Sequence, residues 1–303
     1  MPQYKVMIAQ FPGNNSTHPD VSDYVLDVFC KMRDDPRIGP KGVGLWRISD
    51  TPITMSRNRC LEIAKANNAD YVLMIDSDMM PDVIPAKDNP ILPAGLRPGK
   101  PFWEEAWPFM LAHQGPCIVA APYCGPPPQE AVYAFDWEQG EGGAKNPNFK
   151  LVNVSRFDAA ARTGIQRAAA LATGLMLIDL RAIERLPHPR FYYEFTDAKH
   201  TAKASTEDVT FSRDLDAVGV PLYCAWDSWA GHWKPKLVVR PERIGGYLVP
   251  QMLAERAAQM VGEKDVGKIG IENDRHSPSE SKKPVVYVES TATDPIRVSG
   301  DDF

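Results

Sequence analysis

Two aspartates, Asp76 and Asp78, directly follow a short apolar run at residues 71–75. Residues two apart in a strand point to the same side, so the spacing predicts two carboxylates that project together from a strand end. Like charges this close are costly unless a cation or a proton offsets them. Mg²⁺ and Mn²⁺ bind such oxygens and bridge readily to phosphates. The pair is a candidate site for a metal and a diphosphate, with a solvated acidic turn as the alternative.

A second acidic pair, Glu207 and Asp208, lies at the start of a helix expected at residues 206–218. The helix dipole stabilises acidic side chains in a first turn, which explains the pair without any function. A carboxylate within hydrogen-bond reach of a hydroxyl can instead remove its proton as a general base. His232 follows Gly231 in an expected turn, and its neutral imidazole can ligate Mn²⁺, although a lone histidine is more often structural.

Two arginines, Arg57 and Arg59, fall in the first turn of a helix expected at residues 55–67, with Thr54 or Ser56 as its N-cap. A guanidinium has the fork geometry to bind a diphosphate or a buried carboxylate. A surface salt bridge is the simpler alternative. The residue type alone leaves these possibilities open.

These candidates lie on an alternation of strands and helices. Over the first 80 residues, strands are expected at 4–10, 44–49 and 71–75, and helices at 21–32 and 55–67. This β-α-β-α-β order implies a parallel sheet with helices on its faces, and ligands bind such sheets at the carboxyl ends of the strands. Later helices are expected at 102–113, 206–218 and from Arg181, and later strands at 117–122, 170–180 and 222–226.

The composition is that of an ordinary globular protein, with 44% hydrophobic and 24% charged residues among 303. A net charge of -5 argues against broad electrostatic binding to nucleic acid. The five cysteines show no CxxC spacing and are expected to be buried free thiols in a reducing cytoplasm. The N-terminus lacks the apolar stretch of a signal peptide, and no run is long enough to span a bilayer.

The pattern changes beyond Gly246. Residues 247–261 predict one amphipathic helix, and the polar sequence from Gly262 onward predicts a flexible or loosely attached tail. The expected organisation is one domain over residues 1–245, followed by a C-terminal helix and tail over residues 246–303.

The segment Ser56-Arg57-Asn58-Arg59, followed by the run at residues 69–79, resembles glycosyltransferases of the GT-A fold and the broad family-two type. Three later segments match the same family in the same order: Thr173-Gly174, Glu207-Asp208 and Gly231-His232. The resemblance covers residues 4–236. It implies an α/β, Rossmann-like GT-A (nucleotide-diphospho-sugar transferase) fold, with a mixed, mostly parallel sheet flanked by helices. It also implies a nucleotide-diphosphate sugar donor and a Mn²⁺ or Mg²⁺ ion held by the DxD motif.

The resemblance also implies roles for single residues. Asp78 and His232 are expected to ligate the metal, and Asp76 to contact the ribose or complete the metal site through a bound water. Asp208 is favoured as the residue that engages the acceptor hydroxyl as a base, with Glu207 as the close alternative. The expected nucleotide contacts are Arg57, Phe11, Gly13 and Asp50, although Phe-Pro-Gly-Asn here departs from the segment usual in the family.

The expected function is transfer of a sugar from a UDP- or GDP-sugar to an unidentified hydroxyl acceptor, which is a glycan, a small molecule or modified DNA. A bacterial cytoplasm or a virus-infected host cell suits such an enzyme. Two alternatives stay open. A nucleotidyltransferase would use two metal-bound carboxylates on an NTP, although the chain has no Walker-type Gly-rich loop. A non-catalytic module for glycan or nucleic acid would keep the fold without turnover.

Overall fold

The structure is a computed structural model that describes most of the chain up to Val249. The described residues are 3–12, 17–49, 52–82, 97–126, 129–138 and 151–233, together with the backbone of 237–238, 242–244 and 247–249. Among their helices, none combines the length and the apolar character needed to cross a membrane.

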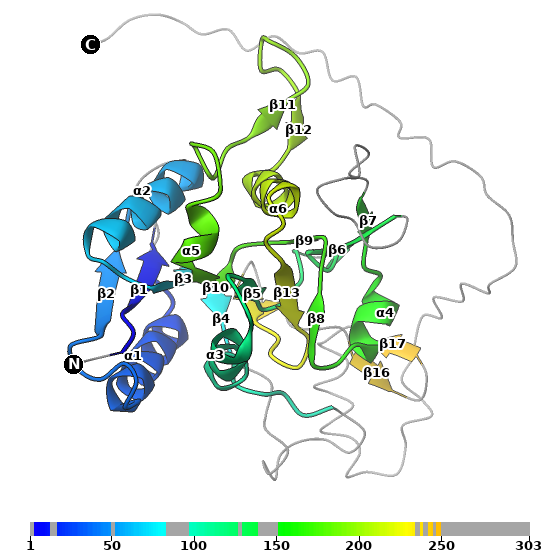
Figure 1. The fold of residues 1–303 in the computed structure, drawn as a ribbon. Coiled ribbons are helices and arrows are strands. Elements are labelled where there is room, and N and C mark those ends of the chain that lie inside the picture. The colour runs from blue at the N-terminus through cyan, green and yellow to red at the C-terminus, as the bar shows by residue number, and fades with distance from the viewer. Residues whose placement is uncertain are drawn as a thin grey trace, which may run out of the picture. The chain divides into compact units, whose positions relative to one another are not determined.

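A seven-stranded sheet forms the centre of the fold, in the order β2-β1-β3-β10-β5-β13-β8 (Figure 1). Its strands are β1 (Val6–Phe11), β2 (Val43–Arg47), β3 (Tyr71–Asp76), β5 (Ile118–Ala120), β8 (Ile165–Arg167), β10 (Leu175–Asp179) and β13 (Leu222–Ala225). Strands β10 and β8 run opposite to the others. The prediction of an α/β fold with a mixed, mostly parallel sheet is confirmed.

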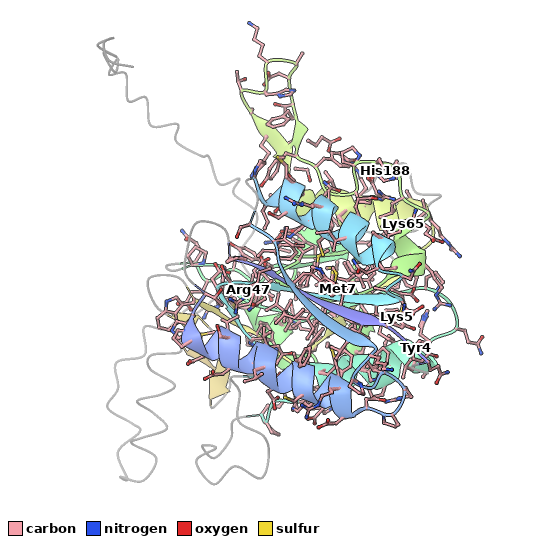
Figure 2. The ribbon with its side chains drawn as sticks, turned by 90° about the vertical axis from the view of Figure 1, so that its left-hand side faces the viewer. Tyr4, Lys5, Met7, Arg47, Lys65 and His188 are labelled. Carbon is pink, nitrogen blue, oxygen red and sulfur yellow. The ribbon has the colours of Figure 1, made fainter. Side chains whose placement is uncertain are left out.

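Helices cover both faces of this sheet. Successive residues of a strand point to opposite sides, so alternate residues of one strand pack against different helices. In β1, Val6 and Ile8 pack toward α1 (Pro19–Asp34) and α3 (Phe102–Ala112). Met7 and Ala9 pack on the other side, toward α2 (Ile53–Ala66), α5 (Leu180–Ile183) and α6 (Glu207–Ala217). Figure 2 shows α1 and α2 on opposite sides of β1, with Met7 between them. A short helix, α4 (Arg156–Ala161), follows β7.

Small sheets flank the main one. Two of them have three strands: β4 (Met79–Met80), β14 (Gly231–Trp233) and β15 (Leu237–Val238) form one, and β6 (Ala134–Trp137), β7 (Leu151–Asn153) and β9 (Ala170–Leu171) form the other. Two more are strand pairs: β11 (Glu194–Phe195) with β12 (Lys203–Ser205), and β16 (Glu242–Ile244) with β17 (Tyr247–Val249). The β4–β14 pairing matters most here, because it joins the segment after Asp78 to the segment that contains His232.

Several predicted elements differ from the structure. The strand expected at 170–180 is divided, because β9 pairs with β6 and β10 enters the main sheet after Gly174. The turn expected at Gly231 is strand β14. Helix α2 begins after Pro52 without a side-chain cap, so neither predicted N-cap is correct.

The C-terminal helix was predicted to begin at Tyr247, but Tyr247–Val249 is a strand that pairs with β16. The Gly-Gly dipeptide between these two strands is a hairpin signal, and β-branched and aromatic residues favour a strand over a helix. The remainder of the predicted helix and the tail lie outside the described residues.

Candidate active site

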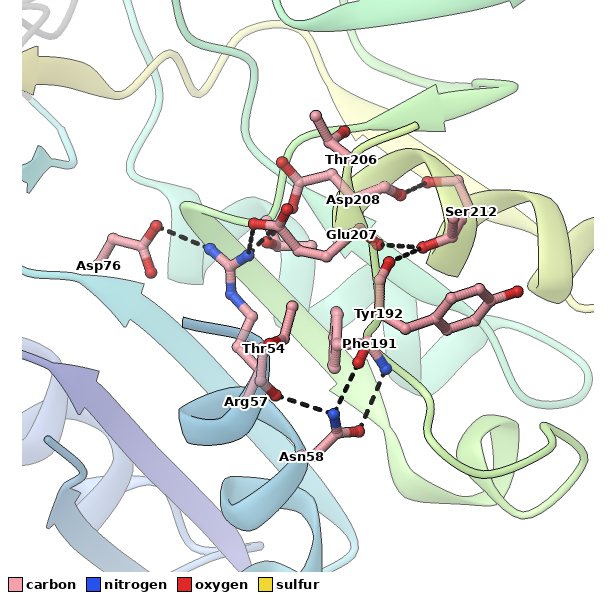
Figure 3. A network of polar contacts seen from close by, with 12 residues as sticks. Thr54, Arg57, Asn58, Asp76, Phe191, Tyr192, Thr206, Glu207, Asp208 and Ser212 are labelled. Carbon is pink, nitrogen blue, oxygen red and sulfur yellow. Dashed lines mark hydrogen bonds and ion pairs between the residues drawn. The ribbon is translucent and has the colours of Figure 1, made fainter. Parts of the chain in front are cut away.

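A buried arginine, Arg57 on α2, joins three carboxylates from distant parts of the chain. Its Nη2 donates to Asp76 Oδ2 (2.9 Å), and its Nη1 donates to Glu207 Oε1 (2.9 Å) and Asp208 Oδ1 (3.1 Å) (Figure 3). The Arg57 side chain is 3% exposed. The guanidinium also lies over the Phe191 ring, 5.9 Å from its centroid.

The fold brings these groups to one edge of the sheet. Asp76 is the last residue of β3, and Glu207 and Asp208 form the first turn of α6. Between them, Asp76 N donates to Gly174 O (2.8 Å), and the neighbouring Thr173 Oγ1 donates to Asp208 Oδ1. The Thr-Gly segment therefore links both acidic elements of the site.

Negative charge is in excess here, since three carboxylates face one guanidinium. Burial raises the pKa of Asp76 to about 7; Arg57 opposes this rise, and the negative charge of Asp78 adds to it. Burial also raises the pKa of Glu207, and the adjacent Asp208 raises it further. Oδ1 of Asp76 is buried and has no hydrogen-bond partner. Buried carboxyl groups with raised pKa values are often found at functional sites.

Asp76 and Asp78 have different partners: Asp76 accepts from Arg57, whereas Asp78 faces His232. The physical reason is that β3 ends at Asp76, so the alternation of a strand does not extend to Asp78, which lies in the turn before β4. Oδ2 of Asp78 lies 3.5 Å from Nε2 of His232, and Asp78 O accepts a hydrogen bond from Trp233 N (2.8 Å).

His232 is 6% exposed and is held in a defined orientation. Its Nδ1 lies 2.8 Å from the backbone oxygen of Cys124. A carbonyl oxygen only accepts, so Nδ1 carries a proton, and Nε2 faces the Asp78 carboxylate. Two arrangements satisfy this contact: a proton on Nε2 that pairs with Asp78, or a metal ion held by both atoms. Metal-binding histidines commonly donate their other N–H to a carbonyl in this way.

The Asp78 carboxylate and the His232 imidazole fit a divalent ion that takes its remaining ligands from phosphate groups and water. Within the part of the chain that the structure describes, no three His, Cys, Asp or Glu side chains converge as a complete metal-binding set. Mg²⁺ is usually held by one or two carboxylates together with phosphates and water, rather than by an all-protein cage. Asp78 and His232 can supply two ligands to such an ion, whereas Asp76 is engaged by Arg57.

Tyr123, which the sequence interpretation did not single out, also lies at this site. Its ring contacts the His232 ring edge-on at 5.0 Å between centroids. Burial raises its pKa well above the ordinary value, and the nearby Asp208 and Asp76 raise it further, so the phenol stays protonated. A Cβ on Gly174 would lie 2.8 Å from Met79 Sδ and 3.0 Å from Tyr123 Cε1, so this glycine lets both side chains approach.

Asn58 is a second residue whose part was missed, although it lies in the Ser-Arg-Asn segment. Its Nδ2 donates to Phe191 O (2.7 Å), and its Oδ1 accepts from Arg190 N (3.0 Å) and Phe191 N (3.1 Å) (Figure 3). Asn58 therefore holds the chain segment before α6 against α2. An asparagine amide can both donate to and accept from the backbone, and this property of the residue type could have indicated its role.

Of the other predicted nucleotide contacts, Phe11 is buried, and Gly13 and Asp50 lie outside the residues that the structure describes. The Phe11 side chain is 3% exposed and packs in the core, although its backbone lies beside Asp76 in the sheet register. Both Nη atoms of Arg57 donate to carboxylates, which is the second of the two binding partners considered for this guanidinium.

No protein-family model matches the sequence, and no curated protein matches it. Solved structures align with it at low identity. A197 from STIV is 13% identical over 80% of this chain and 96% of its own, with a TM-score of 0.44. GalNAc-T7 with UDP, GalNAc and Mn²⁺ is 13% identical over 81% of this chain and 45% of its own, with a TM-score of 0.39. An apo UDP-glucose pyrophosphorylase is 9% identical over 78% of this chain and 74% of its own, with a TM-score of 0.34. At these scores the matches carry no argument about function, which rests on the site.

Proposed function

We propose that this protein is a metal-dependent glycosyltransferase that moves a sugar from a UDP- or GDP-sugar to a hydroxyl acceptor. The observation that carries the proposal is the pair of Asp78 Oδ2 and His232 Nε2, 3.5 Å apart beside three further carboxylates. This arrangement supports a cation, and the sequence resemblance supports a diphosphate as its companion ligand.

Asp78 and His232 would hold Mn²⁺ or Mg²⁺. Such an ion neutralises the charge that develops on a diphosphate leaving group. Asp76 is fixed by Arg57 through Oδ2, and the Asp76 side chain is still 20% exposed, so it can meet a ribose hydroxyl or a metal-bound water.

Asp208 is the better candidate for the base. Thr173 and Arg57 both donate to its Oδ1, which leaves Oδ2 without a hydrogen bond to any described residue. That oxygen can accept the proton of an acceptor hydroxyl. Glu207 is more enclosed and pairs with Arg57, so we assign it to fixing the guanidinium.

A reducing cytoplasm suits the proposal. All five cysteines are free thiols, and four of them are buried. Disulfides are rare in that compartment.

The experiment is calorimetric binding of Mn²⁺ and UDP or GDP, followed by donor hydrolysis or transfer with a panel of UDP- and GDP-sugars. We expect nucleotide binding to require the metal, and Asp78→Ala and His232→Ala to lower turnover at least about 100-fold. The matched control is Asp34→Ala, an exposed aspartate on α1.

An Asp78→Ala variant that binds metal and nucleotide as the parent does would sink the proposal. Release of pyrophosphate from an NTP, with no turnover of any sugar donor, would assign nucleotidyl transfer instead. Metal-independent glycan binding without turnover would assign a binding module.

A further inference from the structure

Tyr123 lies between the two halves of the proposed site. On one side its ring contacts His232, which faces Asp78. On the other it lies against Gly174, whose carbonyl accepts from Asp76 N and whose neighbour Thr173 bonds Asp208. The side chain is thus positioned by groups that belong to both the metal pair and the acidic pair of α6.

The hydroxyl of Tyr123 lacks a protein partner. The residue is 6% exposed, and its hydroxyl makes no hydrogen bond to any other described residue. Unlike the hydroxyl of Tyr24, that of Tyr123 is not a fully enclosed atom, so a ligand can reach it and accept its proton in a hydrogen bond. Its electrostatic neighbours are Asp208, Asp76 and Asp78, together with Arg57, so the hydroxyl lies within the charged site.

We propose that Tyr123 determines which sugar is transferred, by donating a hydrogen bond to a hydroxyl of the donor's sugar ring. The inference rests on the proposed function. If the diphosphate binds at Asp78 and His232, and the acceptor binds at Asp208, the transferred sugar lies between them, beside Tyr123.

The charge of the surroundings favours a sugar hydroxyl over a phosphate oxygen as the partner. Both Nη atoms of the guanidinium are engaged by three carboxylates, so an anionic group next to Tyr123 would meet excess negative charge. A neutral hydroxyl avoids that repulsion, and it can accept from the phenol while it donates to a carboxylate.

The test compares Tyr123→Phe with the parent, using UDP and GDP with Mn²⁺ and then the UDP- and GDP-sugars that the parent turns over. We expect Tyr123→Phe to bind the nucleoside diphosphate as the parent does and to lose about tenfold in kcat/KM for the sugar donor, the size of one neutral hydrogen bond. With deoxy donors that lack one ring hydroxyl at a time, the loss disappears for the one analogue that lacks the contacted group.

The control is Tyr133→Phe. Tyr133 packs on the Tyr123 ring at 5.5 Å, but its own hydroxyl is directed at Gly125, where a Cβ would lie 2.5 Å away. This variant should match the parent in all assays, and thermal unfolding checks that both variants fold.

The outcomes separate the two proposals. If the parent binds neither UDP nor GDP with Mn²⁺, the proposed function fails and the inference fails with it. If the parent turns over a donor, either of two results overturns the inference about Tyr123 and leaves the proposed function standing. One is a kcat/KM for the sugar donor that is the same in Tyr123→Phe and the parent. The other is that Tyr123→Phe weakens binding of the nucleoside diphosphate as much as it lowers kcat/KM, and lowers kcat/KM equally for every deoxy donor.

Discussion

Two clusters of charged residues in this protein are built on opposite principles. At the end of α1, Asp35 faces one guanidinium: Arg37 Nη2 donates to Oδ2 (2.6 Å) and Nε to Oδ1 (2.9 Å), and Trp107 Nε1 adds a third contact (3.0 Å). Around Arg57, three carboxylates share one guanidinium. Arg57 Nε and one oxygen of Asp76 have no hydrogen-bond partner.

The difference teaches how to separate a structural ion pair from a functional one. In the Asp35 cluster the charges cancel and both carboxylate oxygens have partners, so the group needs nothing from outside the protein. In the Arg57 cluster the fold holds surplus negative charge, which a cation or protons from outside can relieve, and an enclosed carboxylate oxygen that lacks a partner. Removing one partner from a buried charge cluster is costly, because a charge then remains without compensation.

The largest expected effect follows loss of the shared cation. Arg57→Leu leaves the buried Glu207 and the partly buried Asp76 and Asp208 without a counter-charge, so we expect the free energy of unfolding to fall by about 3 kcal/mol and donor turnover to be lost. Urea unfolding followed by circular dichroism measures the change. Lys65→Leu, an exposed position on the same helix, should stay within about 0.5 kcal/mol of the parent. Equal stability of Arg57→Leu and the parent would remove the distinction between the two clusters.

A smaller effect, confined to rate, is expected at Asp208. Asp208→Asn keeps an Oδ1 acceptor for Thr173 and Arg57 but removes the base, so turnover should fall about 100-fold or more. The free energy of unfolding should be unchanged or higher, because one of three like charges is gone. Steady-state kinetics and urea unfolding on the same preparation test both parts. A Glu207→Gln variant that loses more activity than Asp208→Asn would exchange the roles of the two residues.

The smallest effect is expected in the balanced cluster. The hydrogen bond from Arg37 lowers the pKa of Asp35 to about 2, so its contribution to stability is present above pH 4 and is lost as the pH falls toward 2. Arg37 is partly exposed, and water screens the pair. We expect Asp35→Asn to lower the free energy of unfolding by about 1–2 kcal/mol at neutral pH, and the difference from the parent to shrink toward pH 2.

Urea unfolding at a series of pH values measures this dependence, with Asp23→Asn, exposed on the same helix, as the control. A difference that stays constant from pH 7 to pH 2 would show that Asp35 acts through its shape rather than its charge. Donor turnover at neutral pH should be the same in Asp35→Asn and the parent.

The sheet was predictable because each central element carries its own periodicity. The apolar run at 71–75 and the helical spacing in α1 show which residues of each element are buried, because burial of one face appears in the sequence as a regular spacing of apolar residues. The insertion of β10 against β3 was not predictable, because pairing with a strand a hundred residues away leaves no local pattern. The partners of Arg57 escaped for the same reason, since Asp76 is 19 and Glu207 is 150 residues away.

The sequence identified which residues form the candidate site, but it did not predict how those residues contact one another. The sequence pattern brought out Asp76, Asp78, Asp208 and His232, and the structure gathers them at one edge of the sheet. Their division into two pairs depends on β3 ending at Asp76 and on β14 being a strand. Both are set by tertiary pairing with β4 and Gly174, which no short window of sequence contains.

The anchoring of the chain before α6 has a consequence for how the protein can vary. Asn58 holds Arg190 and Phe191, and Thr210 Oγ1 donates to Tyr192 O (2.7 Å), so the chain is fixed just ahead of the β11–β12 hairpin, which extends beyond α6 in Figure 1. Within the hairpin, Asp197 organises the turn through Lys199, Thr201 and Ala202. Because the chain before β11 is held independently of the turn, lengthening the turn costs little more than loop closure, which grows slowly with length. The turn of this hairpin can therefore vary in length while Asn58 and Thr210 keep the preceding chain in place.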